Sequence, residues 1–164
     1  MPRHLIRAAA TPQDIAQARA LFEEYAARLG VSLCFQGFDR ELATLPGSYA
    51  PPRGGLWLAG APDVQGCIAL RPLAHDATGA ATHDVAEIKR LYVRDAARGT
   101  GLGRELAQTA LDEARARGYR LVKLDTLAQM DAARALYASL GFRACAAYYD
   151  NPLGGTLYME LPLG

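Results

Sequence analysis

Three glycines at alternate positions form the segment of this chain best suited to chemistry. Gly99, Gly101 and Gly103 follow Arg98, close behind an apolar segment that ends in L-Y-V, and an amphipathic stretch begins directly after them. Glycine allows backbone N–H groups to approach an anion, and the N-terminus of a helix adds partial positive charge. The segment is therefore predicted to bind the diphosphate of a cofactor.

A dinucleotide is one cofactor that this segment could hold. Gly99 and Gly101 follow a predicted strand, and Asp125 ends the next one, where dinucleotide sites place an acid for the ribose. The third glycine of G-x-G-x-x-G is missing, however, because Arg104 occupies its position. The R-D-A-A-R stretch also separates the strand from the glycines, whereas the dinucleotide motif turns directly off its strand. A nucleotide-dependent dehydrogenase is therefore disfavoured.

The composition is that of an ordinary globular protein. The 164 residues suit a single domain, residues 1–164, with one core. The net charge of +1 gives no electrostatic reason to expect binding to nucleic acid or to an anionic membrane. Cys34, Cys67 and Cys145 are far apart and odd in number, which argues against a disulfide framework or a zinc site. No metal site is expected.

Neither the first residues nor the histidines carry a functional signal. The start, M-P-R-H-L-I-R, lacks the apolar core of a signal peptide. No apolar run reaches the roughly 18 residues that span a bilayer, so a cytoplasmic protein is expected. His4, His75 and His83 have no partner at triad or metal spacing, and each is interpreted as an ordinary surface or loop residue.

Periodic patterns predict the elements that position the glycine segment. Thr11-Pro12 has the features of a helix start, and Gly30 those of a helix end. Strands that first follow one another and later alternate with helices predict an α/β fold, with a mixed sheet and helices on both faces. The predicted strands span residues 4–8, 56–61, 66–70, 84–93, 120–126, 142–149 and 156–161, and the predicted helices span 12–29, 38–45, 102–117 and 131–140.

Two blocks of the sequence resemble the GNAT N-acetyltransferase superfamily. R-G-T-G-L-G is similar to its acyl-CoA signature, Q/R-x-x-G-x-G/A, with Arg98, Gly101 and Gly103 at the defined positions. A-A-R-A-L-Y-A-S-L-G-F is similar to its block N-x-x-A-x-x-L-Y-x-x-x-G-F, although Met130 stands where that block often has asparagine. The resemblance implies a mostly antiparallel sheet of about seven strands, in the order strand, two helices, three strands, helix, strand, helix and two strands.

The resemblance also implies that acetyl-CoA is the cosubstrate. Backbone N–H groups of the glycine segment would bind its pyrophosphate, and Arg98 would add charge. The fourth strand would splay from the fifth and pair with the pantetheine arm like an added strand. The cofactor-binding residues implied in this way are Leu91, Val93, Arg98, Gly99, Gly101, Leu102, Gly103 and Arg104. No contact is carried over to position 130.

Two catalytic residues are implied, each with a structural alternative. Glu87 corresponds to a glutamate that in some members removes the proton of the amine, directly or through water; it could instead be paired with Lys89 or Arg90. Tyr137 corresponds to a tyrosine that donates a proton to the CoA thiolate, which suits a phenol protonated at neutral pH. It could instead pack with the apolar face of its helix. Regular alternation along the strand places Glu87 and Val93 on one face.

The acceptor implied by the resemblance is a primary amine of a small molecule or of an amino-acid-like compound. Relatives line their acceptor site with segments that here carry Phe35, Gln36, Tyr49 and Tyr148. Arg90 could hold a carboxylate of the substrate or pair with an acid. A regular strand places Arg90 opposite Glu87, and a β-bulge would change that phase.

Two functions therefore stay open beside the dehydrogenase. One is an acetyl-CoA-dependent N-acetyltransferase that works by direct attack of the amine, with homodimerisation left open. The other is a non-catalytic acyl-CoA-binding module, which Met130 favours slightly and which Glu87 and Tyr137 argue against. The sequence carries no readable code for the identity of the acceptor.

Overall fold

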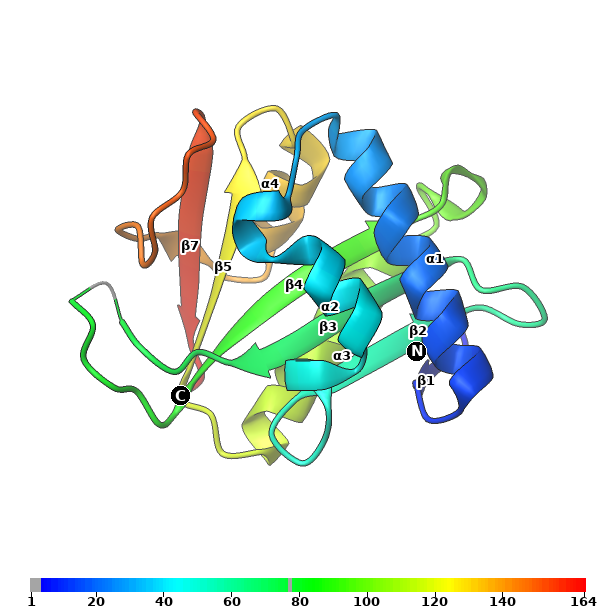
Figure 1. Cartoon of the computed structure of the whole chain (residues 1–164), viewed down its shortest axis with the longest axis horizontal. Helices are drawn as coiled ribbons and strands as arrows, with labels where there is room; N and C mark the ends of the chain where they lie inside the picture. Colours follow the sequence, from blue (N-terminus) through cyan, green and yellow to red (C-terminus); the bar gives the residue numbers. More distant parts are fainter. Residues whose placement is uncertain (1–3, 77) are drawn as a thin grey trace.

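The computed structural model describes residues 4–76 and 78–164 and contains a seven-stranded sheet (Figure 1). The strands stand in the order β1-β2-β3-β4-β5-β7-β6, and every neighbouring pair is antiparallel except β4 with β5. The predicted mixed, mostly antiparallel fold is thus confirmed. The strands are β1 (Ile6–Ala8), β2 (Gly55–Ala59), β3 (Gly66–Pro72), β4 (Val85–Val93), β5 (Leu121–Leu127), β6 (Arg143–Ala144) and β7 (Thr156–Pro162). The helices are α1 (Pro12–Leu29), α2 (Phe38–Thr44), α3 (Leu102–Ala116) and α4 (Asp131–Ser139), with short 3-10 helices η1 (Cys34–Gln36), η2 (Gly47–Tyr49) and η3 (Asp95–Ala97).

Helices cover both faces of the sheet, α1 and α2 on one face and α3 and α4 on the other (Figure 1). Leu21 and Phe22 of α1 pack with Leu58 of β2 in one apolar core. Leu106 of α3 packs with Ile68 of β3 in the other. Successive strand residues point to opposite faces, and β2, β3 and β4 contribute to both cores, whereas β5 and β7 contribute only to the core that contains Leu106. The two faces are called here the α1 face and the α3 face.

The start of α1 is held by a reciprocal pair of hydrogen bonds. The Thr11 hydroxyl accepts from the Asp14 N–H at 3.1 Å, and Asp14 Oδ2 accepts from the N–H groups of Thr11 and Ala10 at 3.2 and 2.9 Å. This capping box confirms the predicted helix start. The N–H groups of Ala10 and Thr11, followed by Arg7, lower the pKa of Asp14 to about 2.

This cap predicts an acid-dependent loss of stability. Because the pKa of Asp14 is lower in the folded chain than its ordinary 3.8, its contribution is present above pH 3.8 and is lost as pH falls through 2. Replacing Asp14 by Asn should cost about 1–2 kcal/mol at pH 7 and almost nothing at pH 2. Urea unfolding of both proteins at several pH values measures this; an equal cost at all pH values would contradict it.

A β-bulge at Arg90 interrupts β4. The pairing of β4 with β3 shifts between Cys67 and Ala69, and Arg90 has a positive φ of 61°. An extra residue in the strand reverses the alternation of side chains beyond it. Ile88 before the bulge and Val93 after it accordingly both pack on the α3 face.

The bulge changes which side chains share a face with Glu87. The prediction that Glu87 and Val93 lie on one face is wrong, because it assumed a regular strand. Glu87, next to Ile88, points to the α1 face, and Val93 points to the α3 face. Arg90 contacts Phe38 of α2 and therefore lies on the same face as Glu87.

The expected splay between β4 and β5 is confirmed. The two strands pair only where residues 85–87 face residues 121–123. Beyond Glu87, the described part of β4 pairs with β3 alone. The edge of β4 that faces β5 therefore has backbone N–H and C=O groups that are not paired with another strand. The opened space lies toward the start of α3, where a bound extended group could pair with β4.

The largest difference from the predicted elements lies near the C-terminus. A strand was predicted over 142–149, but β6 contains only Arg143–Ala144. Cys145 still donates to the Tyr158 carbonyl at 2.9 Å, and further along the chain the hydroxyl groups of Tyr148 and Tyr149 donate to the carboxylates of Glu87 and Asp125. Among the described residues, no helix combines the length and the apolar character that crossing a bilayer requires.

Candidate active site

A groove of about 620 Å³ lies between the splayed end of β4, the start of α3 and the start of α4. All of the predicted cofactor-binding residues except Arg104 line it: Leu91, Val93, Arg98, Gly99, Gly101, Leu102 and Gly103. The Arg104 side chain instead donates a hydrogen bond to Ser139. The structure thus brings the residues of the glycine segment and of β4 into one groove.

The glycine loop presents backbone groups to this groove. Gly99 and Gly101 have φ values of 76° and 88°, and a Cβ atom built on either would meet no atom within 4 Å. Gly101 is the N-cap of α3 and provides no side-chain cap, so the N–H groups of Leu102, Gly103 and Arg104 keep the free orientation of a first helical turn. This open, positively polarised end suits a diphosphate.

Arg98 stabilises the glycine loop through polar contacts. Its guanidinium pairs with Asp95 at 3.2 Å and donates to the Val93 carbonyl at 3.2 Å. The side chain remains half exposed at the edge of the groove. Arg98 therefore adds positive charge near the glycines while it holds the loop against the end of β4.

A substitution in the loop gives a direct test of the groove. Gly101→Ala adds a methyl group where there is open space, but alanine tolerates a φ of 88° poorly, at a cost of about 1–2 kcal/mol. Affinity for CoA, measured by calorimetry, should fall about tenfold if the loop binds it. Gly79→Ala, in a distant loop with a φ of 84° and open space, is the matched control and should leave the affinity unchanged.

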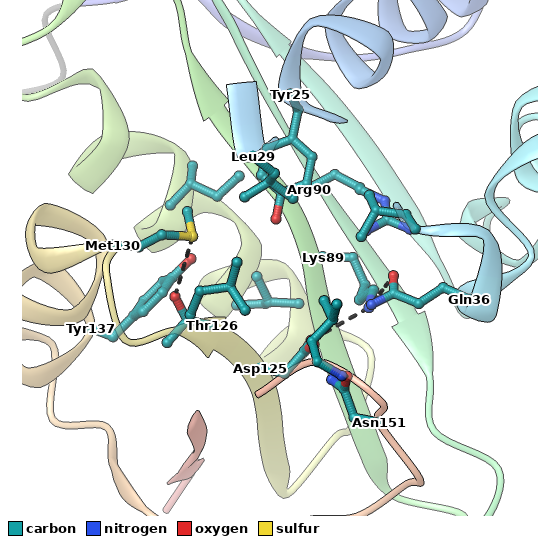
Figure 2. A pocket seen from close by; sticks show the side chains of 15 residues that line it. Tyr25, Leu29, Gln36, Lys89, Arg90, Asp125, Thr126, Met130, Tyr137 and Asn151 are labelled. Atoms are coloured by element: carbon teal, nitrogen blue, oxygen red, sulfur yellow. Dashed lines mark hydrogen bonds and ion pairs between the residues drawn. The ribbon is translucent and has the colours of Figure 1, made fainter. Parts of the chain in front are cut away.

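The inner end of the groove adjoins a smaller cavity between β4 and β5 (Figure 2). Tyr137, Thr126, Asp125, Lys89 and Gln36 contribute to its lining. Four residues line both spaces: Tyr25, Leu29, Leu91 and Met130. A molecule that fills the groove therefore has its inner end at this cavity, which is called here the Tyr137 cavity.

Tyr137 packs in the core and also lines the cavity, so its position fits both alternatives that the sequence left open. Its ring packs edge to face on Phe142, with centroids 5.7 Å apart, and its hydroxyl points toward Met130 and Thr126 (Figure 2). Burial, followed by Tyr25 and then the charge of Asp125, raises the pKa of Tyr137. The phenol is therefore protonated at neutral pH, and the higher pKa makes it a weaker acid than an ordinary tyrosine.

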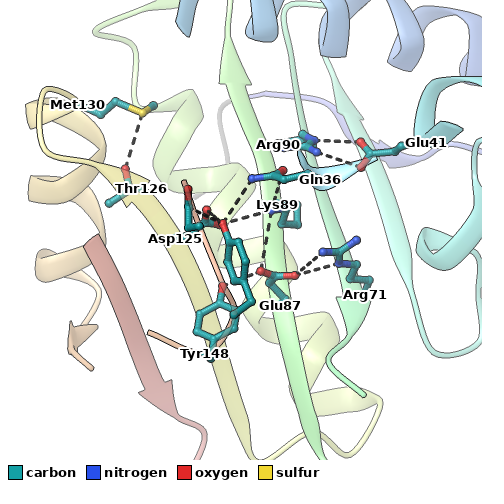
Figure 3. A network of polar contacts seen from close by, with 12 residues as sticks. Gln36, Glu41, Arg71, Glu87, Lys89, Arg90, Asp125, Thr126, Met130 and Tyr148 are labelled. Atoms are coloured by element: carbon teal, nitrogen blue, oxygen red, sulfur yellow. Dashed lines mark hydrogen bonds and ion pairs between the residues drawn. The ribbon is translucent and has the colours of Figure 1, made fainter. Parts of the chain in front are cut away.

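Glu87 is buried in a network of polar contacts (Figure 3). Its Oε1 accepts from Arg71 Nε at 2.9 Å and pairs with Nη2 at 2.8 Å, and its Oε2 accepts from the Tyr148 hydroxyl at 2.6 Å. Lys89 Nζ lies 3.9 Å from Oε2. Glu87 is thus ion-paired, as one alternative expected, but its main partner is Arg71 rather than Lys89 or Arg90. Glu87 lines a third cavity next to the Tyr137 cavity.

Arg90 is paired with an acid, the second of its two alternatives. Nε and Nη2 donate to the two carboxylate oxygens of Glu41 at 2.9 and 3.0 Å, and the guanidinium lies 5.2 Å from the centre of the Phe38 ring. Burial alone would lower the pKa of Arg90, but the hydrogen bonds to Glu41, its charge and other neighbouring groups together raise that pKa. Because the buried guanidinium of Arg90 already binds Glu41, it is not free to bind a carboxylate of the substrate.

A second carboxylate, Asp125, lies in the lining of the Tyr137 cavity. Its Oδ1 accepts from Lys89 at 3.4 Å, and its Oδ2 accepts from the Tyr149 hydroxyl. Lys89 also donates to Gln36 at 3.1 Å, and Asn151 donates to the Tyr149 hydroxyl at 2.9 Å. Burial, followed by the charge of Asp125, raises the pKa of Tyr149.

The predicted acceptor residues are partly brought together. Gln36 and Tyr148 line the third cavity, and Gln36 also lines the Tyr137 cavity. Tyr49 is instead buried in the core of the α1 face, edge to face with Phe22. Phe35 belongs to η1, and its side chain lies outside the described part of the structure.

Several residues at the site were not predicted as functional. Tyr25 was taken only as part of an apolar stripe, yet it lines both the groove and the Tyr137 cavity, and burial raises its pKa to about 12. Asp125 and Lys89 were considered only for other roles, and Glu41 and Arg71 for none. Their partners are distant in sequence, so spacing along the chain gives no signal for them. Within the described ranges, no three His, Cys, Asp or Glu residues gather as metal ligands would.

Comparisons with known proteins agree with this geometry. Residues 18–142 match the Acetyltransferase (GNAT) family. An uncharacterised N-acetyltransferase of Schizosaccharomyces pombe is 35% identical over 160 residues, which cover 96% of this chain and 94% of that protein.

Solved structures show the same fold. An acetyltransferase from Streptococcus agalactiae has a TM-score of 0.77 at 21% identity, covering 99% of this chain and 100% of that one. The yncA acetyltransferase of Salmonella typhimurium, solved with its cofactor acetyl-CoA, has a TM-score of 0.70 at 23% identity, covering 99% and 95%. The chain belongs to the GNAT family of acyl-CoA-dependent N-acyltransferases.

Proposed function

We propose that this protein transfers the acetyl group of acetyl-CoA to a primary amine of a small or amino-acid-like acceptor, by direct attack of the amine. The observation that carries the proposal is the junction of the glycine-lined groove with the Tyr137 cavity. A ligand whose diphosphate lies at Gly99–Gly103 and whose arm follows β4 ends beside the Tyr137 hydroxyl. Acetyl-CoA, when bound, supplies a thioester for the neutral amine to attack.

The residues of the groove bind and orient the cosubstrate. The N–H groups at the start of α3 hold the diphosphate, and the free edge of β4 at Leu91 and Val93 pairs with the amide groups of the arm. The apolar side chains of Leu29 and Leu136 border the groove and limit the access of water. This arrangement favours transfer to the acceptor over hydrolysis.

Tyr137 provides the proton for the leaving thiolate. Its phenol is protonated over the whole neutral range, as that of an ordinary tyrosine is, and its position at the inner end of the groove supports this role. A protein that only binds acyl-CoA does not require a phenol at the inner end of the groove, so the position of Tyr137 favours a catalytic function over a binding module.

Glu87 is the proposed base for the amine and takes its proton through water, because Glu87 lines the third cavity and not the Tyr137 cavity. Asp125 is the competing carboxylate, because it lines the Tyr137 cavity itself. The amine loses its proton before it attacks, so either carboxylate should shape the acidic limb of the pH profile of kcat/KM.

Matched amide variants separate the two carboxylates. Glu87→Gln should lower kcat/KM about tenfold at neutral pH and less at high pH, where a larger fraction of the acceptor amine is already neutral. Asp125→Asn should leave the acidic limb in place. The reverse pattern in the two pH profiles would assign the base to Asp125 and reject Glu87.

Transfer itself is tested by incubating the protein with acetyl-CoA and a panel of primary amines, with release of the CoA thiol as the readout. Acceptor-dependent release above hydrolysis is expected for some amines. Binding of CoA without such release for any amine would instead support the non-catalytic module. A cytoplasmic location is part of the same proposal, and the oligomeric state is left open.

A further inference from the structure

A third cavity of about 200 Å³ lies beside the Tyr137 cavity on the α1 face (Figure 3). Its lining residues are Gln36, Arg71, Leu73, Glu87, Lys89, Tyr148 and Tyr149. Gln36 and Lys89 also line the Tyr137 cavity, so the two spaces share a wall. At about 30 Å³ for each water molecule, the volume holds a small polar group with a short stem rather than a large ligand.

The charges around this cavity are nearly balanced. Arg71 and Lys89 are positive and Glu87 is negative among the lining residues, and Asp125, outside the lining, pairs with Lys89 at 3.4 Å. The hydroxyl groups of Tyr148 and Tyr149 and the Gln36 amide add polar contacts on the same wall. An anion in this cavity would therefore depend on a cation that still has free hydrogen-bond donors.

Arg71 has donors left for such a group. An arginine carries five N–H bonds in a planar fork, and Glu87 accepts through one oxygen, Oε1, from Nε and Nη2. Three N–H bonds therefore remain, and the side chain is 31% exposed. Burial would lower the pKa of Arg71, but the charge of Glu87, its hydrogen bond and other neighbouring groups together raise that pKa, so the guanidinium stays charged.

The other two cations of the network are already taken. Arg90 is buried, and its fork is filled by Glu41. Lys89 is buried, donates to Gln36 and Asp125 at 3.1 and 3.4 Å, and lies 3.9 Å from Glu87 Oε2. Arg71 is therefore the cation of this group that can accept a further anionic partner.

We infer that the third cavity binds a carboxylate of the acceptor through Arg71, and that the acceptor is an amine that also carries a carboxylate. This inference rests on the proposed function. The amine of such a molecule would reach across the wall formed by Gln36 and Lys89 into the Tyr137 cavity, where Asp125 provides negative charge. Opposite charges at the two ends of the site would orient the molecule with its amine toward the thioester.

Matched pairs of acceptors test this inference. Each pair contains an amino acid and the amide of its carboxyl group, across a panel with side chains of different size. In the wild type, kcat/KM for the best carboxylates should exceed that of their amides about tenfold or more, as expected for a lost charge-assisted hydrogen bond.

Three variants locate the effect at Arg71. Arg71→Lys keeps the charge but loses the planar fork, and should reduce the ratio of carboxylate to amide several-fold. Arg71→Gln combined with Glu87→Gln removes the ion pair as a unit, which avoids leaving Glu87 buried and unpaired, and should bring the ratio close to one. Arg115→Gln, on the exposed side of α3, should leave the ratio unchanged. Because each ratio is taken within one variant, a change in kcat from Glu87 cancels.

A second measurement does not need turnover. Calorimetry on the CoA-saturated protein compares N-acetylamino acids with their amides, and the carboxylates should bind more tightly in the wild type but not in the double variant. The inference is overturned if acetyl transfer occurs with equal kcat/KM for both members of every pair, or if the preference survives in the double variant. If no amine is acetylated, the proposed function fails, and the binding comparison alone decides on the carboxylate site.

Discussion

Replacement of Tyr137 by phenylalanine is expected to lower kcat for acetyl transfer by about a hundredfold or more, with little change in the KM for acetyl-CoA. Proton transfer by a positioned side chain typically contributes 10²–10⁴-fold in rate. The change removes one hydroxyl at the inner end of the groove and leaves the ring packed on Phe142. Since the groove itself is untouched, binding of the cosubstrate should persist while the thiolate loses its proton donor.

The pH dependence of this step follows from the burial of Tyr137. Its pKa is raised above the ordinary value of 10, so the phenol remains protonated below pH 10. In the wild type, kcat should therefore show no loss from this group as pH rises to 9. Rate measurements across this range, with calorimetry of CoA binding for Tyr137→Phe, check both expectations.

Tyr119→Phe is the matched control for Tyr137→Phe. Tyr119 is also a buried tyrosine of the α3 face, and its hydroxyl donates to the Arg53 carbonyl at 2.9 Å, away from the groove. Both variants lose one buried hydroxyl, so a general effect on stability would appear in both. An equal fall in kcat for the two variants, or no fall for Tyr137→Phe, would reject Tyr137 as the acid.

Local patterns along the chain were sufficient to predict most elements of this fold. The start of α1 follows from Thr11 and Asp14, and the order of strands and helices follows from apolar periodicity and glycine positions. The glycine segment is a local feature as well, because its phosphate-binding character depends on consecutive backbone groups. These predictions succeed because the residues that decide them are neighbours in sequence.

The features that failed all depend on contacts between distant segments. The bulge at Arg90 is stabilised by Glu41, which lies 49 positions away in the sequence, and no local pattern marks it. The strand predicted over 142–149 is shorter in the structure, and Tyr148 instead donates to Glu87, 61 positions away. Which charged residues form pairs at a site depends on the folded structure. The sequence shows which residue types are present but not which of them form ion pairs.

The pairing of Arg90 with Glu41 is expected to have the largest effect on stability. Arg90 is not glycine, yet it holds a φ of 61°, a conformation that costs about 1–3 kcal/mol and persists only when the surroundings impose it. Glu41 imposes it by filling the guanidinium fork, and Phe38 covers the group. Glu41→Ala would leave a buried, unpaired guanidinium and should cost about 3–5 kcal/mol.

The same change should weaken binding of the cosubstrate. Leu91 and Val93 follow the bulge, and the phase of their backbone groups along the edge of the groove depends on it. If the bulge relaxes in Glu41→Ala, the KM for acetyl-CoA should rise although position 41 does not line the groove. Urea unfolding and steady-state kinetics on the same preparations measure the two effects. The control is Glu23→Ala on the exposed side of α1, which should change the free energy of unfolding by no more than about 0.5 kcal/mol and leave the KM for acetyl-CoA unchanged.

A second substitution shows whether the pair acts as a clamp on the bulge. Arg90→Gly removes the unpaired charge and accepts a positive φ without strain. Combined with Glu41→Ala, it should therefore recover part of the stability and part of the acetyl-CoA affinity that Glu41→Ala alone loses. If the losses of the two single variants instead add up in the double variant, the two residues act independently, and the bulge does not depend on their contact.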